Sequence, residues 1–171
     1  MDRIDNGCTV EVMAEAKARG CLTKLDAFAS TFENFSLVAP LLPYTDYFMP
    51  SDEEAMALVG LSDFEEITQF LLDQSAGAVI LTQGVGVIYI DKNATRFDLP
   101  SSMIEVGCTC GCGDRFNTGF AKGFHLVKST DDCLYFGETS PSQNALGLRS
   151  QAVVETPDQT MNFIETKSLR V

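Results

Sequence analysis

The sequence feature that most constrains the fold is a short unbroken apolar run, Ala78-Val79-Ile80-Leu81. A strand with one face in water would alternate apolar and polar residues, so this run predicts a strand covered on both faces, as parallel strands are. Two helices with clear starts precede it, because Ser51 and Ser62 are each followed three residues later by a glutamate, the pattern of a capping box. Helices that separate short apolar runs predict an α/β fold with a parallel, doubly wound sheet.

The rest of the chain continues this alternation. The expected strands cover residues 21–26, 47–49, 87–90 and 96–99, and the expected helices cover residues 10–18, 35–42, 116–127, 131–148 and 157–166. Phe116, Phe120, Phe124 and Val127 form the apolar stripe of one helix. Pro141 is expected to kink or divide another. The chain contains no internal repeat, low-complexity tract or clear linker, so residues 1–171 are predicted to form one domain.

Composition excludes several classes of function. The chain has 24 acidic and 12 basic residues and a formal net charge of −12, which repels a phosphate backbone and argues against general nucleic-acid binding. No apolar run approaches the roughly 20 residues that span a bilayer, so no membrane partner is expected. The first seven residues lack the apolar segment of a signal peptide. A cytoplasmic location is therefore the expectation.

Three of the six cysteines, Cys108, Cys110 and Cys112, are crowded into five residues. This spacing suits no ordinary disulfide framework, and reduced thiols are expected in a cytoplasmic protein. An alternative is a metal or redox site in which Cys133 or His125 completes the shell around a soft cation. The C-x-C-x-C pattern lacks the C-x-x-C pairs of common zinc modules. A reactive Cys112 with a low pKa at the start of a helix is a further reading.

The glycine-rich segment 107–113 carries the strongest chemical signal. It follows an extended stretch and opens the amphipathic helix that holds Phe116. Small residues let backbone N–H groups approach a ligand, and a helix N-terminus favours negative charge, so the segment predicts an anion site. Asp114 lies in the first turn, where it could accept a proton from a hydroxyl next to a bound phosphate. The alternative is that Asp114 only stabilises the helix start.

Residues 108–120 resemble the second signature of the ribokinase-like, or pfkB-type, carbohydrate kinases, D-T-x-G-x-G-D followed by x-F-x-x-G. The matching positions are Thr109, Gly111, Gly113, Asp114, Phe116, Gly119 and Phe120. Upstream, residues 81–87 resemble the family's nucleotide-binding T-x-G-x-x-G-V segment, with one residue fewer between the glycines. Residues 49–54 resemble its N-x-x-E segment. The similarity runs from about residue 8 to the C-terminus and corresponds to the C-terminal part of such a kinase.

This resemblance implies a ribokinase-like, three-layer sheet, truncated on its N-terminal side, and a kinase that uses ATP and Mg²⁺ to phosphorylate a sugar hydroxyl. Asp114 would be the catalytic base, and Gly111, Cys112 and Gly113 would form the anion hole. The nucleotide would contact Thr82, Gly84, Gly86 and Asn144. Glu54 would help place Mg²⁺, although helix capping also explains this residue, and Gly84 and Gly86 also suit a plain turn.

The chain departs from the family pattern at Cys108, Cys110, Ser51 and Arg115. Arg115 follows the proposed base and could reach a phosphate, crowd the anion hole, or pair with Asp114 and lower its basicity. The N-terminal half of the family, with most sugar-binding residues, has no counterpart here. A truncated or impaired kinase is therefore expected, with a second copy or a separate N-terminal half as partner. The alternative is a non-catalytic remnant that binds nucleotide or assembles with a partner.

Overall fold

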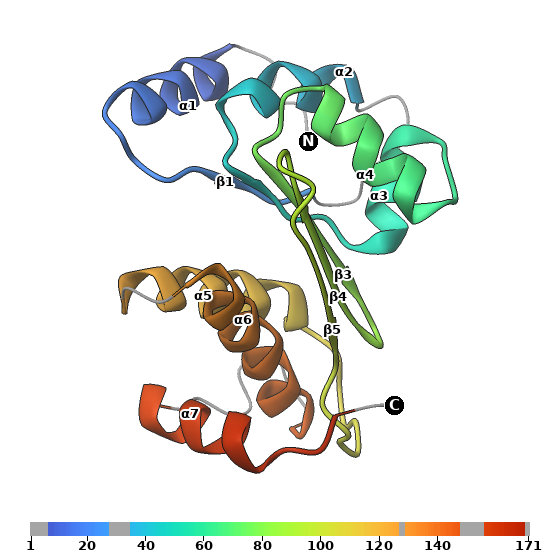
Figure 1. Cartoon of the computed structure of the whole chain (residues 1–171), viewed down its shortest axis with the longest axis vertical. Helices are drawn as coiled ribbons and strands as arrows, with labels where there is room; N and C mark the ends of the chain where they lie inside the picture. Colours follow the sequence, from blue (N-terminus) through green and yellow to red (C-terminus); the bar gives the residue numbers. More distant parts are fainter. Residues whose placement is uncertain (1–6, 28–34, 127–128, 148–155, 170–171) are drawn as a thin grey trace. The chain divides into compact units, whose positions relative to one another are not determined.

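The computed structural model describes residues 7–27, 35–126, 129–147 and 156–169 (Figure 1). Predictions for residues 1–6, Val127 and residue 148 lie outside these ranges. In chain order the elements are α1 (Cys8–Ala18), β1 (Lys24–Leu25), α2 (Phe35–Val38), the 3₁₀ helix η2 (Ala39–Tyr44), β2 (Tyr47–Phe48), α3 (Asp52–Val59), α4 (Phe64–Asp73), β3 (Ala78–Gln83), β4 (Gly86–Asp91), β5 (Arg96–Pro100), α5 (Cys112–His125), α6 (Thr130–Ala145) and α7 (Pro157–Thr166). None of the described helices combines the length and apolar character needed to cross a membrane.

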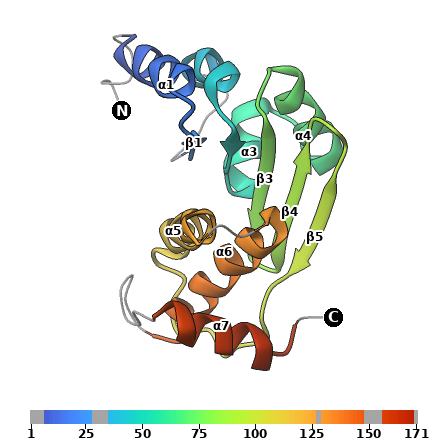
Figure 2. The same cartoon turned by 60° about the vertical axis from the view of Figure 1, so that its left-hand side comes forward.

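The described strands form one sheet in the order β1-β2-β3-β4-β5. β1 pairs with β2 and β2 pairs with β3 in parallel, with Lys24 opposite Tyr47 and Tyr47 opposite Ala78. β3 and β4 are neighbours joined by only two residues, a connection that only antiparallel strands allow. Figure 2 shows β3, β4 and β5 side by side, as successive strands of a β-meander. The predicted α/β class is confirmed, and the sheet is parallel where helices connect its strands and antiparallel where turns do.

The chain divides into two compact units. Unit 1 comprises Met1–Thr82 with Ile88–Arg96, and unit 2 comprises Gln83–Val87 with Phe97–Val171. The prediction that residues 1–171 form one domain stays a prediction.

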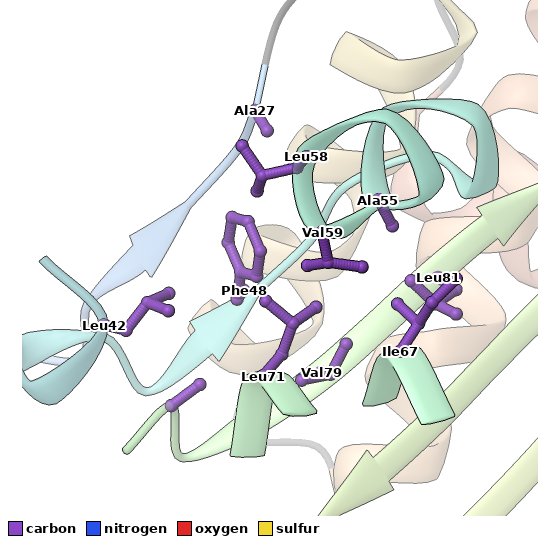
Figure 3. Close-up of a cluster of buried hydrophobic side chains, with 11 residues drawn as sticks. Ala27, Leu42, Phe48, Ala55, Leu58, Val59, Ile67, Leu71, Val79 and Leu81 are labelled. Carbon is purple, nitrogen blue, oxygen red and sulfur yellow. The ribbon is translucent and has the colours of Figure 1, made fainter. Parts of the chain in front are cut away.

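The core of unit 1 lies between the sheet and helices α3 and α4. Leu58 and Leu71 from these helices pack with Phe48 of β2 and Val79 of β3, and all four side chains are fully buried (Figure 3). Ile80, the alternate neighbour of Val79, is also fully buried. β3 is therefore covered on both faces, as its unbroken apolar sequence predicts.

Local signals placed some element ends correctly. Ser51 and Glu54 form the predicted capping box, and Pro157 begins α7 as the pattern indicates. The prediction for Ser62 was wrong: Asp63 is the N-cap of α4 and accepts a hydrogen bond from the Glu66 N–H at 3.0 Å. A carboxylate is an equally good cap with an added charge, so the adjacent aspartate takes this role.

Three further predictions needed full or partial correction. The segment expected to be a helix over 35–42 changes after Val38 into the 3₁₀ helix η2, which contains Pro43 and has a proline in its first turn. A 3₁₀ helix has tighter turns, and proline fixes a backbone angle that it accepts. Pro141 does not divide α6, which is one helix from Thr130 to Ala145, and the kink expected there stays a prediction. The strand expected over 21–26 covers only Lys24–Leu25.

In unit 2, α5 and α6 pack closely because glycine occupies both sides of their contact. A Cβ atom on Gly119 of α5 would overlap the Phe136 carbonyl oxygen of α6. A Cβ atom on Gly137 of α6 would lie 2.9 Å from the Phe116 ring. The predicted stripe is confirmed at Phe116 and Phe120, which are buried with their rings stacked at 6.2 Å between centroids.

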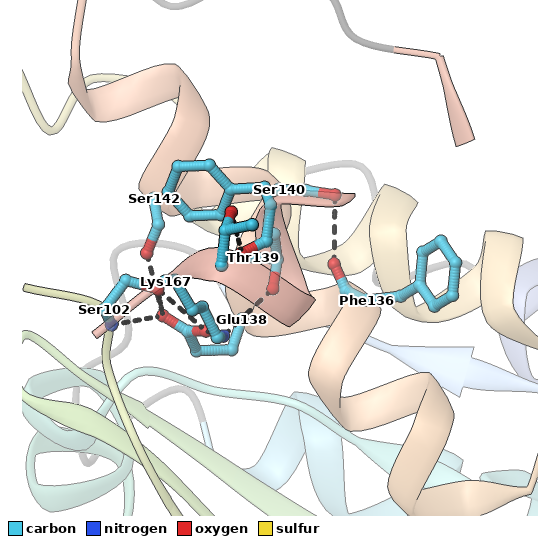
Figure 4. Close-up of polar contacts among 9 residues, drawn as sticks. Ser102, Phe136, Glu138, Thr139, Ser140, Ser142 and Lys167 are labelled. Carbon is cyan, nitrogen blue, oxygen red and sulfur yellow. Dashed lines mark hydrogen bonds and ion pairs between the residues drawn. The ribbon is translucent and has the colours of Figure 1, made fainter. Parts of the chain in front are cut away.

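A buried ion pair joins the C-terminal segment to α6 within unit 2. Lys167 and Glu138 form it, and each side chain is only 3% exposed. The Glu138 carboxylate also accepts hydrogen bonds from the Ser102 N–H at 2.8 Å and the Ser142 hydroxyl at 2.7 Å (Figure 4). These donors satisfy the carboxylate, which would otherwise be costly to bury.

We expect Lys167→Met to lower the free energy of unfolding by about 3–5 kcal/mol, because it leaves a buried carboxylate without its cation. Urea denaturation of the full chain measures this. The double variant Lys167→Met/Glu138→Gln should recover much of the loss, since no charge is then buried alone. Equal destabilisation of the single and double variants would contradict this account.

A second ion pair, between Lys17 and Asp46 of unit 1, makes the stability of the folded chain depend on pH. Burial by itself would raise the pKa of Asp46, but hydrogen bonds from Lys17 and Thr23 outweigh it and hold the pKa below its usual value. The Thr23 N–H donates at 2.9 Å. A lowered folded-state pKa means that the unfolded chain binds more protons. The stabilisation is therefore present above the unfolded pKa of about 3.9 and is lost as the pH falls through the folded value.

Asp46→Asn should therefore flatten the decline in stability between about pH 5 and pH 3 and lower stability at neutral pH. Urea midpoints measured across this range test the prediction. The matched control is Asp158→Asn, which removes an exposed carboxylate from the first turn of α7. A decline as steep in Asp46→Asn as in the control would contradict the role of Asp46.

Candidate functional site

The glycine-rich segment 107–113 ends at the start of α5, where the predicted anion site lies. Gly111 is the N-cap residue and has a φ of 77°, a left-handed conformation that glycine adopts without strain. The Cys112 N–H donates to Thr109 O at 3.1 Å. The Gly113 and Asp114 amides belong to the first turn, where a helix offers no internal acceptor, and the described backbone bonds include none for them. These two donors and the positive end of the helix suit an anion.

The end of α6 holds this segment in place. The N–H groups of Gly107 and Cys108 both donate to Ala145 O, at 2.7 Å and 3.2 Å. The Asn144 side-chain amide donates to Cys110 O at 3.0 Å, and Asn144 is fully buried. Three bonds from two adjacent residues therefore fix the backbone that leads into α5. A preformed loop gives an anion its donors without an ordering cost.

Asp114 is exposed in the first turn of α5, as predicted from its position. Its backbone oxygen accepts a hydrogen bond from the Thr118 hydroxyl at 2.8 Å. A carboxylate here is accessible to a substrate and lies on the same turn as the Gly113 amide. The geometry within unit 2 thus brings together the predicted base and the predicted anion hole.

Glu54 and Thr82 belong to unit 1, where they are also brought together. Ser51 forms a parallel bridge to Thr82, and the Thr82 N–H donates to Pro50 O at 3.1 Å. The Ser51 N–H donates to Glu54 Oε2 at 2.8 Å. Glu54 therefore follows the carboxyl end of β2, and Thr82 is the penultimate residue of β3, so both lie toward the edge at which α/β sheets bind ligands.

The two glycines of the β3–β4 turn differ in their surroundings. Gly84 is exposed, and a Cβ atom there would meet nothing within 4 Å. Gly86 is buried, and a Cβ atom there would lie 2.5 Å from Leu99 O of β5. The close approach of β5 thus explains why residue 86 is a glycine. The described contacts give no such steric reason for glycine at position 84.

The cysteines near this loop are not equivalent. Cys112 is half-buried, and burial raises its pKa, so the reading of Cys112 as a low-pKa thiol was wrong. Burial also raises the pKa of Cys133 to about 11. Among the described residues, no group of three or more His, Cys, Asp or Glu side chains is placed to hold a metal ion.

Asn144 has a structural contact that the sequence did not reveal. The resemblance implied only that Asn144 lies beside the nucleotide, and the structure adds a hydrogen bond from its side chain to the loop. The Oδ1 atom of Asn144 is buried and has no hydrogen-bond partner among the described residues. Its role toward a nucleotide stays a prediction. No local pattern could have paired Asn144 with Cys110, because the two residues are far apart in sequence and on different elements.

The family model for pfkB carbohydrate kinases matches residues 5–156. This chain belongs to the pfkB carbohydrate kinase family. Among curated relatives, the ribokinase of Haemophilus influenzae is 23% identical over 130 residues, which cover 73% of this chain and 42% of that protein. The cytidine kinase of Thermococcus kodakarensis is 26% identical over 103 residues, or 59% of this chain and 37% of that protein.

Solved structures confirm the ribokinase-like fold. Aminoimidazole riboside kinase from Salmonella enterica, solved with aminoimidazole riboside and an ATP analogue, superposes with a TM-score of 0.80 at 18% identity over 91% of this chain and 56% of its own. A candidate ribokinase II from E. coli, solved with ATP and Mg²⁺, gives a TM-score of 0.80 at 20% identity over 91% of this chain and 52% of its own. The pfkB-family chain thus spans about half the length of these proteins.

Asn144→Ala should lower the free energy of unfolding by about 1–3 kcal/mol, because it leaves the Cys110 carbonyl without its buried donor. Amide hydrogen exchange over residues 107–113 should accelerate, and mass spectrometry measures it. Asn162→Ala, which removes an exposed amide from α7, is the control and should change stability by less than about 0.5 kcal/mol. Unchanged exchange in the loop would contradict the role of Asn144 as its anchor.

Proposed function

We propose that this pfkB-family chain is the nucleotide-binding, C-terminal part of a kinase that transfers the γ-phosphate of ATP to a hydroxyl of a sugar or nucleoside. The observation that carries the proposal is the loop at the start of α5, where the Gly113 amide and the exposed Asp114 carboxylate share one helical turn. The named relatives, a ribokinase and a cytidine kinase, support the substrate class.

The backbone N–H donors of this loop support the proposal that it binds phosphate. Gly111, Cys112 and Gly113 surround the start of α5, and the helix end adds partial positive charge. Phosphoryl transfer develops charge on the equatorial oxygens, so donors fixed before the reaction lower the barrier. The hydrogen bonds that the Asn144 side chain donates and the Ala145 carbonyl accepts hold the loop in place before the reaction. The acidic chain needs only these local donors to accept an anion.

Asp114 is the proposed general base. Its carboxylate would accept the proton of the attacking hydroxyl as that oxygen bonds to phosphorus, and the bond between phosphorus and the ADP oxygen breaks. A positioned base typically contributes about 10²–10⁴-fold to such a step. Arg115, the next residue, would add a positive charge near the phosphate.

Thr82, Gly84, Gly86 and Asn144 are the proposed contacts of the nucleotide, and Glu54 is the proposed contact of Mg²⁺ through water. The hydrogen bonds of the Glu54 carboxylate decide whether it can also accept one from a water bound to Mg²⁺. An ionised carboxylate has about four acceptor positions, and the Ser51 N–H occupies one at Oε2, so Glu54 retains acceptors for a water on a hard cation. Mg²⁺ would supply charge neutralisation for the transferred phosphate.

A non-catalytic role in nucleotide binding or assembly is the second candidate, and one observation favours it. Cys108 replaces the first aspartate of the family signature. The partner in either case would be a second copy or a polypeptide that supplies the sugar-binding half.

Asp114→Asn tests the proposed chemistry. With ATP, Mg²⁺ and a panel of pentoses, hexoses and nucleosides, we expect the variant to form ADP about 10²–10⁴-fold more slowly than the unaltered chain. Because asparagine has the shape of aspartate, ATP affinity measured by calorimetry should change little. Asp158→Asn, at the equivalent turn of α7, is the matched control and should leave turnover unchanged.

Near-normal turnover of Asp114→Asn would reject Asp114 as the base. If ATP raises the melting temperature of the unaltered chain but no sugar or nucleoside is phosphorylated, the binding role is the correct one.

A further inference from the structure

Cys108 and Cys110 form a thiol pair that the proposed phosphotransfer does not use. The Cys110 N–H donates a hydrogen bond to Cys108 Sγ at 3.4 Å. Cys110 is exposed and Cys108 is partly exposed. Residues two apart are separated by at most about 7 Å between Cα atoms, and a disulfide needs a separation of roughly 4.4–6.8 Å, so the chain itself keeps the pair near that range.

The backbone around this pair is fixed from both sides. Cys108 is held through its N–H, which donates to Ala145 O, and Cys110 is held through its carbonyl, which accepts from the buried Asn144. Both partners lie at the end of α6. A tertiary contact therefore fixes the backbone of both cysteines, in addition to the single residue that separates them.

The three thiols of the loop differ in reactivity. The hydrogen bonds from Cys110, first its backbone N–H and then its thiol, lower the pKa of Cys108. The same thiol–thiol bond raises the pKa of Cys110. Cys112 is turned toward Pro141 O, at 3.7 Å from its sulfur, and burial raises its pKa. Only a thiolate attacks a disulfide efficiently, so Cys108 has the character of an attacking thiol.

We propose that Cys108 and Cys110 form a thiol–disulfide exchange site that reacts with a low-molecular-weight disulfide, with Cys108 as the attacking thiol and Cys110 as the resolving thiol. This site does not depend on the proposed phosphotransfer. Its product is an intramolecular disulfide that ends one residue before the left-handed Gly111.

The chemistry balances without any other reactant. The Cys108 thiolate attacks one sulfur of the small disulfide, a mixed disulfide forms, and the first small thiolate leaves. The Cys110 thiolate then attacks Cys108 Sγ, the mixed disulfide breaks, and the second small thiolate leaves. The two protons of the cysteines pass to the two leaving thiolates. Two cysteine thiols are oxidised, and one small disulfide is reduced to two thiols.

The experiment uses the full reduced chain with glutathione disulfide as the probe. At intervals the reaction is stopped with acid, remaining thiols are alkylated, and the tryptic peptide 97–115 is analysed by mass spectrometry. We expect this peptide to lose two hydrogens while only Cys112 is alkylated. Oxidation should proceed at least about tenfold faster than glutathionylation of the exposed Cys21, because the attacking thiol has the lowered pKa.

Three serine variants separate the roles of the thiols. Cys110→Ser should accumulate a stable glutathione adduct on Cys108, because the resolving thiol is gone. Cys108→Ser should slow the reaction of Cys110 to about the rate of Cys21. Cys112→Ser is the matched control and should form the disulfide at the unaltered rate. Circular dichroism and melting temperature confirm that each variant is folded.

Two results would overturn the proposal. One is a disulfide that includes Cys112, seen as loss of oxidation in Cys112→Ser. The other is independent glutathionylation of Cys108 and Cys110 at the rate of Cys21, with no internal disulfide.

Discussion

The close contact of α5 with α6 is the constraint on which the candidate site depends. Glycine at 119 and at 137 lets each helix approach the other where a methyl group would collide. This approach brings the end of α6 against the loop before α5, so that Asn144 and Ala145 hold the backbone of Cys108 and Cys110. A helix start becomes a defined anion site only when the residues that precede it are fixed in this way.

The same anchoring serves two kinds of chemistry on one loop. On the side of α5, the Gly113 amide and Asp114 share a turn that suits a phosphate and a general base. On the other side, before Gly111, the exposed Cys110 donates its N–H to the sulfur of the partly exposed Cys108. The buried pair of Glu138 and Lys167 secures α6 against the C-terminal segment.

Features that depend on neighbouring residues were predictable from the sequence. The capping box of Ser51 and Glu54 is correct because the four residues that form it are consecutive. The strand at β3 is correct because burial on both faces requires an unbroken apolar run. The error at Ser62 has the same local origin, since Asp63 is an adjacent and competing cap. The sequence left open whether Pro141 divides or only kinks its helix, because tertiary packing can outweigh the local preference against proline.

The sequence by itself determined the family, the α/β class and the position of Asp114, because the signature residues and the periodicity are properties of short segments. The tertiary structure decided which distant residues meet. It joined Asn144 to Cys110, Lys167 to Glu138 and Thr82 to Ser51, and it placed the sulfur of Cys112 at 3.7 Å from Pro141 O. The physical reason is that burial and hydrogen bonding between elements depend on their packing, which no pattern within a single element encodes.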